Sequence, residues 1–490
     1  MWWQRYKDGW DLAVAGLRKR VSPQASVLVS GIGLCYFLAF LSLIPQLPGL
    51  IGETGLLPVG ALKDAYLYHY GAAAFWEMKS LAWWVSSGTG LQILAVVGLI
   101  ASVGVVLFRS TVALFLAWII YGSLFVAGQA FLSFQWDSLL LEAGIAGICL
   151  AYVLPPRKKQ HAQEIVSEVE IVDPQATFSL WPALLLVRLL AAKVMISAGL
   201  AKWLSGDIWW REGTALSVHF ETQPLPTVLG WICHQLPFSV LMLGMAWMWV
   251  AEIVAPILAF VPGRTRFYSA LCMMLFQVMI FLTGNYGFFN ILMLVLLLSF
   301  WVPSTEKMRI PTHLVWRGWL LKHAFPLFLI ITLGLGFGNR FVFQSPHLGR
   351  LEAILASWRL QFQYGLFAVM TYPRWEIMLA VSEDKTVWKP ISFYYKPDRL
   401  NQLPWVAPHM PRLDWMMWFA ALHPAPLQLP WLQRLAEGIR KRDPAILALL
   451  PPLPEGDFQY IQIERREYRF SDSDERQRKG VFWVEVTPVF

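Results

Sequence analysis

Charged side chains are scarce in this chain. Only 15% of its 490 residues are Asp, Glu, Lys or Arg, whereas 57% are hydrophobic. Soluble globular proteins carry about a quarter charged residues, so this composition argues against a soluble protein. The formal net charge is only +8, and the basic residues stand in short clusters beside apolar segments. That placement is typical of membrane orientation, and we expect no nucleic-acid partner.

Cysteine is also rare, with only Cys35, Cys149, Cys233 and Cys272 in the whole chain. No two of them have the close spacing of metal ligands, so we predict neither a disulfide framework nor a zinc site. We likewise predict no cofactor. The polar and basic stretch Met1–Gln24 lacks the pattern of a cleavable signal peptide.

Long apolar runs are what the sequence does contain. Nine of them approach the length that crosses about 30 Å of hydrocarbon. If all nine cross, the basic clusters fall on one side, which is then the cytoplasmic side. We therefore predict a polytopic α-helical membrane protein of about nine spans, with a cytoplasmic N-terminus and a transmembrane domain over residues 1–338. The runs are Val27–Ile44, Gly90–Phe108, Thr111–Ala130, Phe134–Leu154, Trp181–Leu204, Phe238–Val261, Phe267–Thr283, Tyr286–Val302 and Lys322–Gly338.

Residues 339–490 have a different character, because they are polar and nearly balanced in charge. We predict an extracytoplasmic mixed β/α domain there, with a closing hairpin of Phe458–Phe470 and Val481–Phe490. The other predicted strands are Tyr364–Thr371, Trp375–Ser382 and Trp388–Tyr395, and the predicted helices are Leu413–Leu422 and Trp431–Arg442. We favour core packing for the aromatic residues near Trp415. A docking face for a client protein, formed by Arg412, Asp414, Trp415 and Trp418, is the alternative.

Two carboxylates, Asp137 and Glu142, interrupt an otherwise apolar segment. A charge inside a bilayer is costly and needs a partner, a cavity or a function. Depth along the predicted helices suggests three ion pairs: Asp137 with Lys202, Glu142 with Lys193, and Arg188 with Glu252. We favour the interpretation in which these pairs fix the register of the helices.

The alternative is chemistry. A lysine in a low-dielectric pocket has a lowered pKa and can act as a base, so Lys202, with Asp137 and Glu142, is a candidate catalytic group. His219 and His234 have no third ligand nearby, which makes a metal site a weak hypothesis. The candidate pocket residues are Lys193, Asp207, Trp209, Trp210, Arg211, His219, Glu221 and His234.

Four motifs together resemble the lipase maturation factor family. They are QLPGLIGETGLLP (Gln46–Pro58), FLSFQWDSLLLEAG (Phe131–Gly144), KWLSGDIWWREGTALSVHFETQPLP (Lys202–Pro226) and PHMPRLDWMMWFAAL (Pro408–Leu422). The resemblance implies a multi-pass membrane protein whose lumenal C-terminal domain acts as a chaperone for secreted client proteins. Its expected partners are the lipid bilayer and a secreted client, with a lipase as one candidate. The family implies the endoplasmic reticulum membrane, or the inner membrane if the source is bacterial.

A weaker resemblance concerns the vitamin-K-dependent carboxylases, and it rests on Lys202, Asp207 and Trp209. It keeps open an intramembrane enzyme that acts on a lipid, quinone or peptide substrate. A lipid-binding scaffold without chemistry is a third interpretation. We favour a maturation factor without enzymatic activity. The C-terminal region departs from the family pattern because it has no cysteine, so we exclude thiol chemistry there, and Pro488–Phe490 carry no retention signal.

Overall fold

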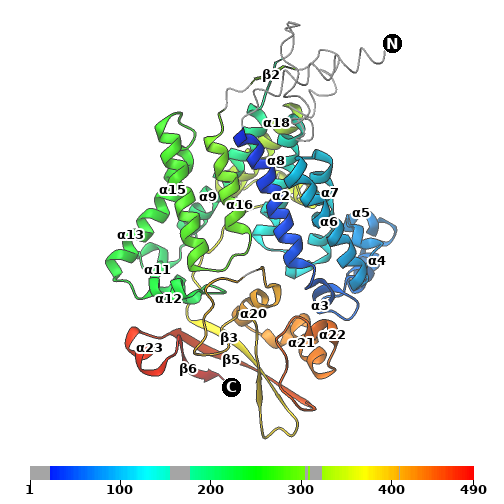
Figure 1. Cartoon of the computed structure of the whole chain (residues 1–490), viewed down its shortest axis with the longest axis vertical. Coiled ribbons are helices and arrows are strands. Elements are labelled where there is room, and N and C mark those ends of the chain that lie inside the picture. The colour runs from blue at the N-terminus through cyan, green and yellow to red at the C-terminus, as the bar shows by residue number, and fades with distance from the viewer. Residues whose placement is uncertain (1–22, 155–176, 304–306, 310–322, 408, 490) are drawn as a thin grey trace, which may run out of the picture.

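The computed structural model describes residues 23–154, 177–303, 307–309, 323–407 and 409–489. A helical bundle forms most of the molecule, and a smaller domain containing a β-sheet lies at one end of it (Figure 1). The predicted basic clusters of residues 1–20 and 157–159, together with Arg317 and Lys322, lie outside the described residues.

The bundle is built from the apolar runs. Seven described helices are long and apolar enough to cross a membrane, and two shorter apolar helices accompany them. All nine coincide with predicted runs, so the chain is a polytopic helical membrane protein. The seven are α2 (Pro23–Leu43), α6 (Gly88–Phe108), α8 (Gln135–Val153), α9 (Trp181–Leu204), α13 (Phe238–Trp249) with η5 (Val250–Val254) and α14 (Ala255–Leu258), α15 (Arg264–Thr283), and α18 (Phe325–Gly338) with η9 (Asn339–Phe343). The shorter two are α7 (Thr111–Ala127) and α16 (Phe289–Leu297) with η6 (Leu298–Trp301).

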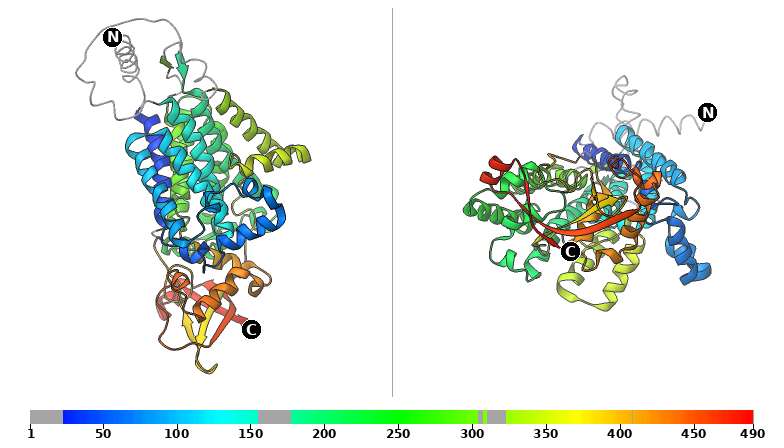
Figure 2. Two further views of the ribbon diagram at one scale, coloured as in Figure 1. Left: turned by 90° about the vertical axis from the view of Figure 1, so that its right-hand side faces the viewer. Right: turned by 90° about the horizontal axis from the view of Figure 1, so that it is seen from below.

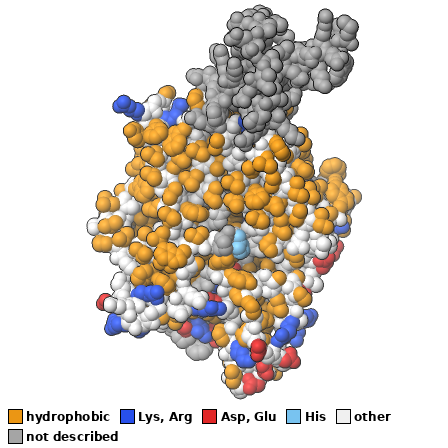
Figure 3. Space-filling model, viewed as in Figure 1, with side chains coloured by type: hydrophobic (Ala, Val, Ile, Leu, Met, Phe, Trp, Pro, Cys, Tyr) orange, Lys and Arg blue, Asp and Glu red, His pale blue; other side chains and the backbone are white. Residues whose placement is uncertain are grey.

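Serine side chains cap the N-termini of α6 and α7, and a sharp turn at Arg109 separates these two apolar helices. The Ser87 side chain accepts the Gly90 amide at the start of α6, and Ser110 accepts the Ala113 amide at the start of α7. Between these helices Arg109 adopts a left-handed conformation, with φ of 54°. Apolar side chains remain exposed on the outer faces of the helices, and they form a broad apolar surface on the face of the bundle that Figure 3 shows. Such a surface is stable in contact with lipid.

Short helices occupy the two long connections between α2 and α6 and between α9 and α13. The first connection holds α3 (Leu47–Ile51), α4 (Val59–Tyr70), η1 (Gly71–Ala73), α5 (Ala74–Met78) and η2 (Leu81–Trp83). The second holds α10 (Ile208–Arg211), α11 (Ala215–Thr222) and α12 (Val228–His234). At the opposite end of the bundle, β1 (Thr177–Ser179) pairs with β2 (Lys307–Arg309).

The C-terminal domain, residues 374–489, contains an antiparallel sheet in the order β4-β3-β5-β6. The strands are β3 (Arg374–Ser382), β4 (Lys389–Ile391), β5 (Tyr460–Phe470) and β6 (Trp483–Val489). The helices are α20 (Arg412–Leu422), α21 (Pro430–Arg440), α22 (Pro444–Leu447) and α23 (Ser473–Lys479), and η10 (Pro426–Gln428) is a 3₁₀ turn. The predicted closing hairpin is confirmed, since β5 and β6 pair. Helix α23 lies between them and was not predicted.

The connection between the two halves differs most from expectation. Helix α18 and the following helix α19 (Pro346–Ser357) form a hairpin that projects from the side of the bundle (Figure 2). The predicted strand Tyr364–Thr371 is wrong, because this stretch has no regular secondary structure. Its aromatic pattern reflects contacts with the bundle: the Tyr364 ring is buried, and its hydroxyl bonds to a carboxylate of α8.

Candidate functional site

A buried ion pair joins the bundle to the C-terminal domain. The Arg412 guanidinium, at the start of α20, donates to both oxygens of Asp137 in α8, at 2.6 and 2.7 Å. It also donates to the Phe131 carbonyl at 3.0 Å, and the Tyr121 hydroxyl donates to Asp137 at 2.5 Å. Both charged side chains are almost completely buried. The prediction that Asp137 pairs with Lys202 is wrong. It compared only residues at similar depths in the membrane helices, whereas the partner of Asp137 comes from the C-terminal domain.

The first motif reaches the same place. Gln46 lies just after α2, and its side-chain oxygen accepts the Arg412 amide at 2.9 Å. Its side-chain nitrogen donates to the Met410 carbonyl at 2.9 Å, while the Ser42 hydroxyl accepts the Met410 amide at 2.8 Å. Three of the four motifs therefore converge on the start of α20, where their buried polar groups satisfy one another.

Glu142, the second carboxylate of α8, also has a partner from outside the bundle. Lys193 of α9 donates to it at 3.0 Å, which confirms the predicted pair. The Tyr364 hydroxyl donates to its other oxygen at 2.9 Å, and the Phe362 amide is a further donor. Residues 359–373, the connecting segment between α19 and β3, thus enter the bundle and donate hydrogen bonds to the Glu142 carboxylate there. Removing either charge would leave the other buried and unpaired, which is strongly destabilising.

The third motif, between α9 and α13, forms the rest of the junction. Its polar groups contact the connecting segment and the C-terminal domain rather than an open pocket. The contacts are the Met370 amide with Asp207 Oδ2 (2.9 Å), Trp210 Nε1 with the Phe367 carbonyl (3.1 Å), the Phe470 amide with Glu221 Oε2 (2.7 Å) and Trp418 Nε1 with the Thr222 carbonyl (2.9 Å).

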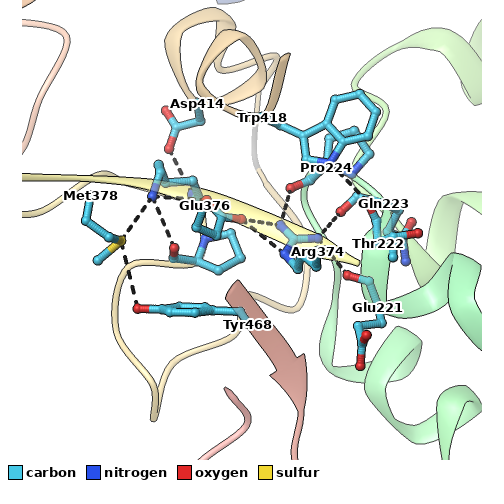
Figure 4. Close-up of polar contacts among 12 residues, drawn as sticks. Glu221, Thr222, Gln223, Pro224, Arg374, Glu376, Met378, Asp414, Trp418 and Tyr468 are labelled. Carbon is cyan, nitrogen blue, oxygen red and sulfur yellow. Dashed lines mark hydrogen bonds and ion pairs between the residues drawn. The ribbon is translucent and has the colours of Figure 1, made fainter. Parts of the chain in front are cut away.

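Arg374, at the start of β3, is the central donor of this part of the junction (Figure 4). Its guanidinium donates to the carbonyls of Glu221, Gln223 and Pro224 at 2.5 to 3.1 Å. It also pairs with Glu376 at 2.5 Å. No sequence signal distinguished Arg374 from the other arginines, because its acceptors are backbone carbonyls and carry no side-chain pattern.

Lys202, the candidate catalytic base, is held in a closed ion pair. Its ammonium donates to both oxygens of Glu252 at 2.8 Å, and both side chains are buried. Glu252 lies in the π-helical turn η5. We had predicted Arg188 as the partner of Glu252, but Arg188 donates to the Ser299 and Val302 carbonyls. A paired ammonium is a poor base, so this geometry favours a structural role.

A double substitution separates the structural role of Lys202 from a catalytic one. Lys202→Met or Glu252→Met alone leaves one buried charge unpaired, and each is expected to cost about 3–5 kcal/mol of stability. Lys202→Met/Glu252→Met removes both charges and is expected to be close to neutral. Thermal unfolding in lipid nanodiscs measures stability, and secretion of an active client measures function. A double variant that folds normally but has lost function would show that Lys202 does chemistry.

Some of the other predicted pocket residues lie close together: the Lys202 ammonium is 5.6 Å from the centre of the Trp210 ring, and Trp210 and His219 both contact Phe367. His234 Nε2 lies 3.9 Å from Glu221 Oε2. His219 and His234 contact different aromatic rings, those of Phe367 and Phe470. Burial, aided by the charge of Lys202, lowers the pKa of His219 to about 4, so this imidazole is neutral at physiological pH. Within the described ranges, no three His, Cys, Asp or Glu side chains form a metal-binding group. Trp209 packs against Tyr372, and Arg211 is exposed on α10.

The predicted client-docking residues are buried, so this hypothesis is wrong for a surface contact and the favoured core-packing interpretation is confirmed. Arg412, Asp414, Trp415 and Trp418 all lie inside the junction or the C-terminal domain. Asp414 accepts the Tyr395 and Lys396 amides at 2.7 and 3.0 Å, and burial raises its pKa to about 6. The predicted helix Leu413–Leu422 is confirmed as part of α20, and most of its side chains pack within the protein.

An open cleft of about 350 Å³ lies on the C-terminal domain. Aromatic rings form much of its wall, and Tyr394 is 55% exposed. Lys396, which lines the cleft, lies 3.2 Å from Glu376, the partner of Arg374. The cleft therefore borders the polar network that holds the two halves together. Its other lining residues include Phe393, Tyr395, Asp398, Asn401, Leu403 and Phe482.

Comparison with known proteins covers both halves of the chain. Residues 24–305 match the family model described as Lipase maturation factor transmembrane domain, and residues 360–487 match Lipase maturation factor C-terminal domain. No solved structure shows significant similarity.

Curated relatives match along most of their length. Lipase maturation factor 1 of Mus musculus is 30% identical, over 95% of this chain and 86% of the relative. Lipase maturation factor 2 of Homo sapiens is 29% identical, over 93% of this chain and 80% of the relative. Lipase maturation factor 2 of Xenopus laevis is 27% identical, over 94% and 80% respectively. The two family models match most of the bundle and most of the C-terminal domain, and the chain therefore belongs to the lipase maturation factor family.

Proposed function

We propose that this chain is a membrane-embedded maturation factor that helps a secreted client protein, with lipases as the client class, to fold and assemble. The observation that carries the proposal is the buried Arg412–Asp137 pair, which holds the C-terminal domain firmly on the bundle. A domain held in this way presents a surface at a constant height above the membrane. A client that emerges from the membrane can meet that surface while it is still folding.

We further propose a topology that suits this role. All nine apolar helices cross the bilayer, and the N-terminus is cytoplasmic. An odd number of spans places the C-terminal domain on the opposite side, in the lumen of the endoplasmic reticulum or in the periplasm. The transmembrane domain ends near residue 338, and the exterior part begins at residue 339. The alternation of basic clusters along the sequence supports this arrangement.

We place the client contact at the cleft of the C-terminal domain. Its aromatic walls suit apolar side chains, and its polar rim suits the backbone of an extended segment. Partly folded secreted proteins expose such segments before their cores close. The closed Lys202–Glu252 pair gives no support to an enzymatic function.

Blocking the cleft tests this function. Asn401 is exposed at the cleft, and Asn401→Trp is expected to lower the secretion of active lipase severalfold in cells that lack their own maturation factor. Client retained by the affinity-purified membrane protein should fall in parallel. Gln477→Trp on α23, also exposed but away from the cleft, is the matched control and should behave as the parent. Normal client secretion in the absence of the whole protein would contradict the proposed function itself.

A further inference from the structure

A compact arm on the side of the bundle carries several exposed aromatic side chains. The arm comprises residues 59–84, from α4 to the residue after η2, and it projects laterally from the bundle (Figures 1 and 2). Tyr68, Trp76 and Trp84 are 86, 69 and 65% exposed, and Tyr70 is also exposed. Monomeric soluble proteins rarely leave so much large apolar surface together, so a partner covers it.

The arm is a built element rather than a loose loop. Phe75 packs against Trp76, Trp83 and Trp84 with ring-centroid distances of 5.0 to 5.9 Å. The Ser80 hydroxyl donates to the Ser123 carbonyl of α7 at 2.8 Å. The backbone carbonyl of Lys79 accepts a hydrogen bond from the Arg359 side chain. These contacts fix the arm to the bundle and leave its aromatic edge facing outward.

The lipid-facing surface continues into the arm. Trp84 lies four residues before Gly88, where α6 begins, and α6 is one of the helices able to cross a membrane. The outer face of α6 exposes Ile93 and Ile100, whose natural environment is lipid. Trp and Tyr are enriched where a span meets the headgroups, because their rings are amphipathic. The aromatic edge therefore lies beside the end of a lipid-facing helix, where the bilayer interface must be.

The two lysines of the arm lie against tryptophan rings. The Lys63 ammonium lies 5.1 Å from the centre of the Trp83 ring and donates to the Trp83 carbonyl at 3.1 Å. The Lys79 ammonium lies 5.6 Å from the ring centre of Trp358, an exposed tryptophan that follows α19. Lys79 also lies 3.8 Å from Glu77, and Asp64 and Glu77 balance the two lysines. An arm without excess charge, whose lysine stems lie along tryptophan rings, suits the boundary between headgroups and hydrocarbon.

We propose that the arm lies in the bilayer interface of the leaflet on the side of the C-terminal domain, with Tyr68, Trp76 and Trp84 inserted among the lipid headgroups. The arm is then a membrane-surface element between two spans, not an aqueous loop. It widens the footprint of the bundle on one side and limits its tilt, because tilting would pull the aromatic rings from the interface or bury the lysines in hydrocarbon.

A depth measurement tests the proposal on the full-length chain in nanodiscs of phosphatidylcholine and phosphatidylglycerol. A spin label is attached at Trp76→Cys, and its collisions with oxygen and with a water-soluble nickel chelate are measured. Ile100→Cys on α6 serves as the lipid reference, and Val387→Cys, in the exposed turn between β3 and β4, serves as the aqueous reference. The unsubstituted chain gives the background from the native cysteines.

We expect the Trp76 label to collide severalfold less often with the nickel chelate than the Val387 label, and to lie at a shallower depth than the Ile100 label. Chelate accessibility equal to that at Val387 would overturn the proposal. So would a label that is aqueous in nanodiscs and becomes protected only when a client protein is added, because the arm would then be a client-binding surface. A similarly low collision rate with the nickel chelate for a label at Tyr68→Cys would show that the result is not specific to position 76.

Discussion

Arg412→Ala is expected to release the C-terminal domain from the bundle and to lower stability by about 3–5 kcal/mol, because it leaves Asp137 buried and without its cation. The change removes four hydrogen bonds that the guanidinium donates, three of them between 2.6 and 3.0 Å. Thermal unfolding in nanodiscs measures the loss. Limited proteolysis should show earlier cleavage within residues 359–373, where the chain passes from the bundle to the sheet.

Two comparisons make this result specific. Arg440→Ala on α21 removes an exposed arginine that pairs with Glu437, and it is expected to lower stability far less than Arg412→Ala. Asp137→Leu combined with Arg412→Leu removes both charges and should recover part of the stability lost in Arg412→Ala. Equal stability of Arg412→Ala and Arg440→Ala would mean that the junction does not depend on the buried pair.

Arg374→Met is expected to produce the second large effect, again about 3–5 kcal/mol, because three buried backbone carbonyls lose their donor and Glu376 keeps only Lys396 as a cationic partner. The guanidinium also lies 4.8 Å from the centre of the Trp483 ring, so packing against β6 is lost as well. Thermal unfolding measures the total cost. Hydrogen exchange at residues 221–228 reports whether the third motif has come loose from the sheet.

Arg466→Met is the matched control for this variant. Arg466 lies on β5, the strand beside β3, and its partially exposed side chain pairs with Glu464 and Glu485. Partially exposed pairs contribute little, so we expect a change within about 1 kcal/mol. Two results would show that Arg374 does not hold the third motif. One is an unfolding temperature of Arg374→Met equal to that of the parent, and the other is a rise in hydrogen exchange confined to β3.

The membrane half could be predicted well because its signal is physical and local. A run of apolar residues long enough to cross hydrocarbon becomes a helix, since no water is present to satisfy its backbone. The Glu142–Lys193 pair followed from the same geometry, because neighbouring antiparallel spans place these residues at matching depths. The hairpin of β5 and β6 followed from alternation along the sequence.

The partners of Asp137 and Lys202 could not be predicted in the same way. Asp137 binds Arg412, which lies just before a helix that the sequence places outside the membrane. Comparing the depths of residues in the spans therefore could not identify this partner. The role of Arg374 rests on backbone carbonyls, which every residue carries. Tyr364 was assigned to a strand because aromatic alternation does not reveal whether the burying surface is a sheet or a bundle.

The distance along the chain between Asp137 and Arg412 has a consequence for biosynthesis. These residues are 275 positions apart, and Asp137 is made first. The membrane half must therefore be inserted while one of its carboxylates still lacks a cation, and that defect persists until α20 has been translated and has docked. A truncated chain that stops before residue 412 can never repair it. We therefore expect such a chain to be less stable than the full-length protein, because its buried carboxylate never acquires a cation.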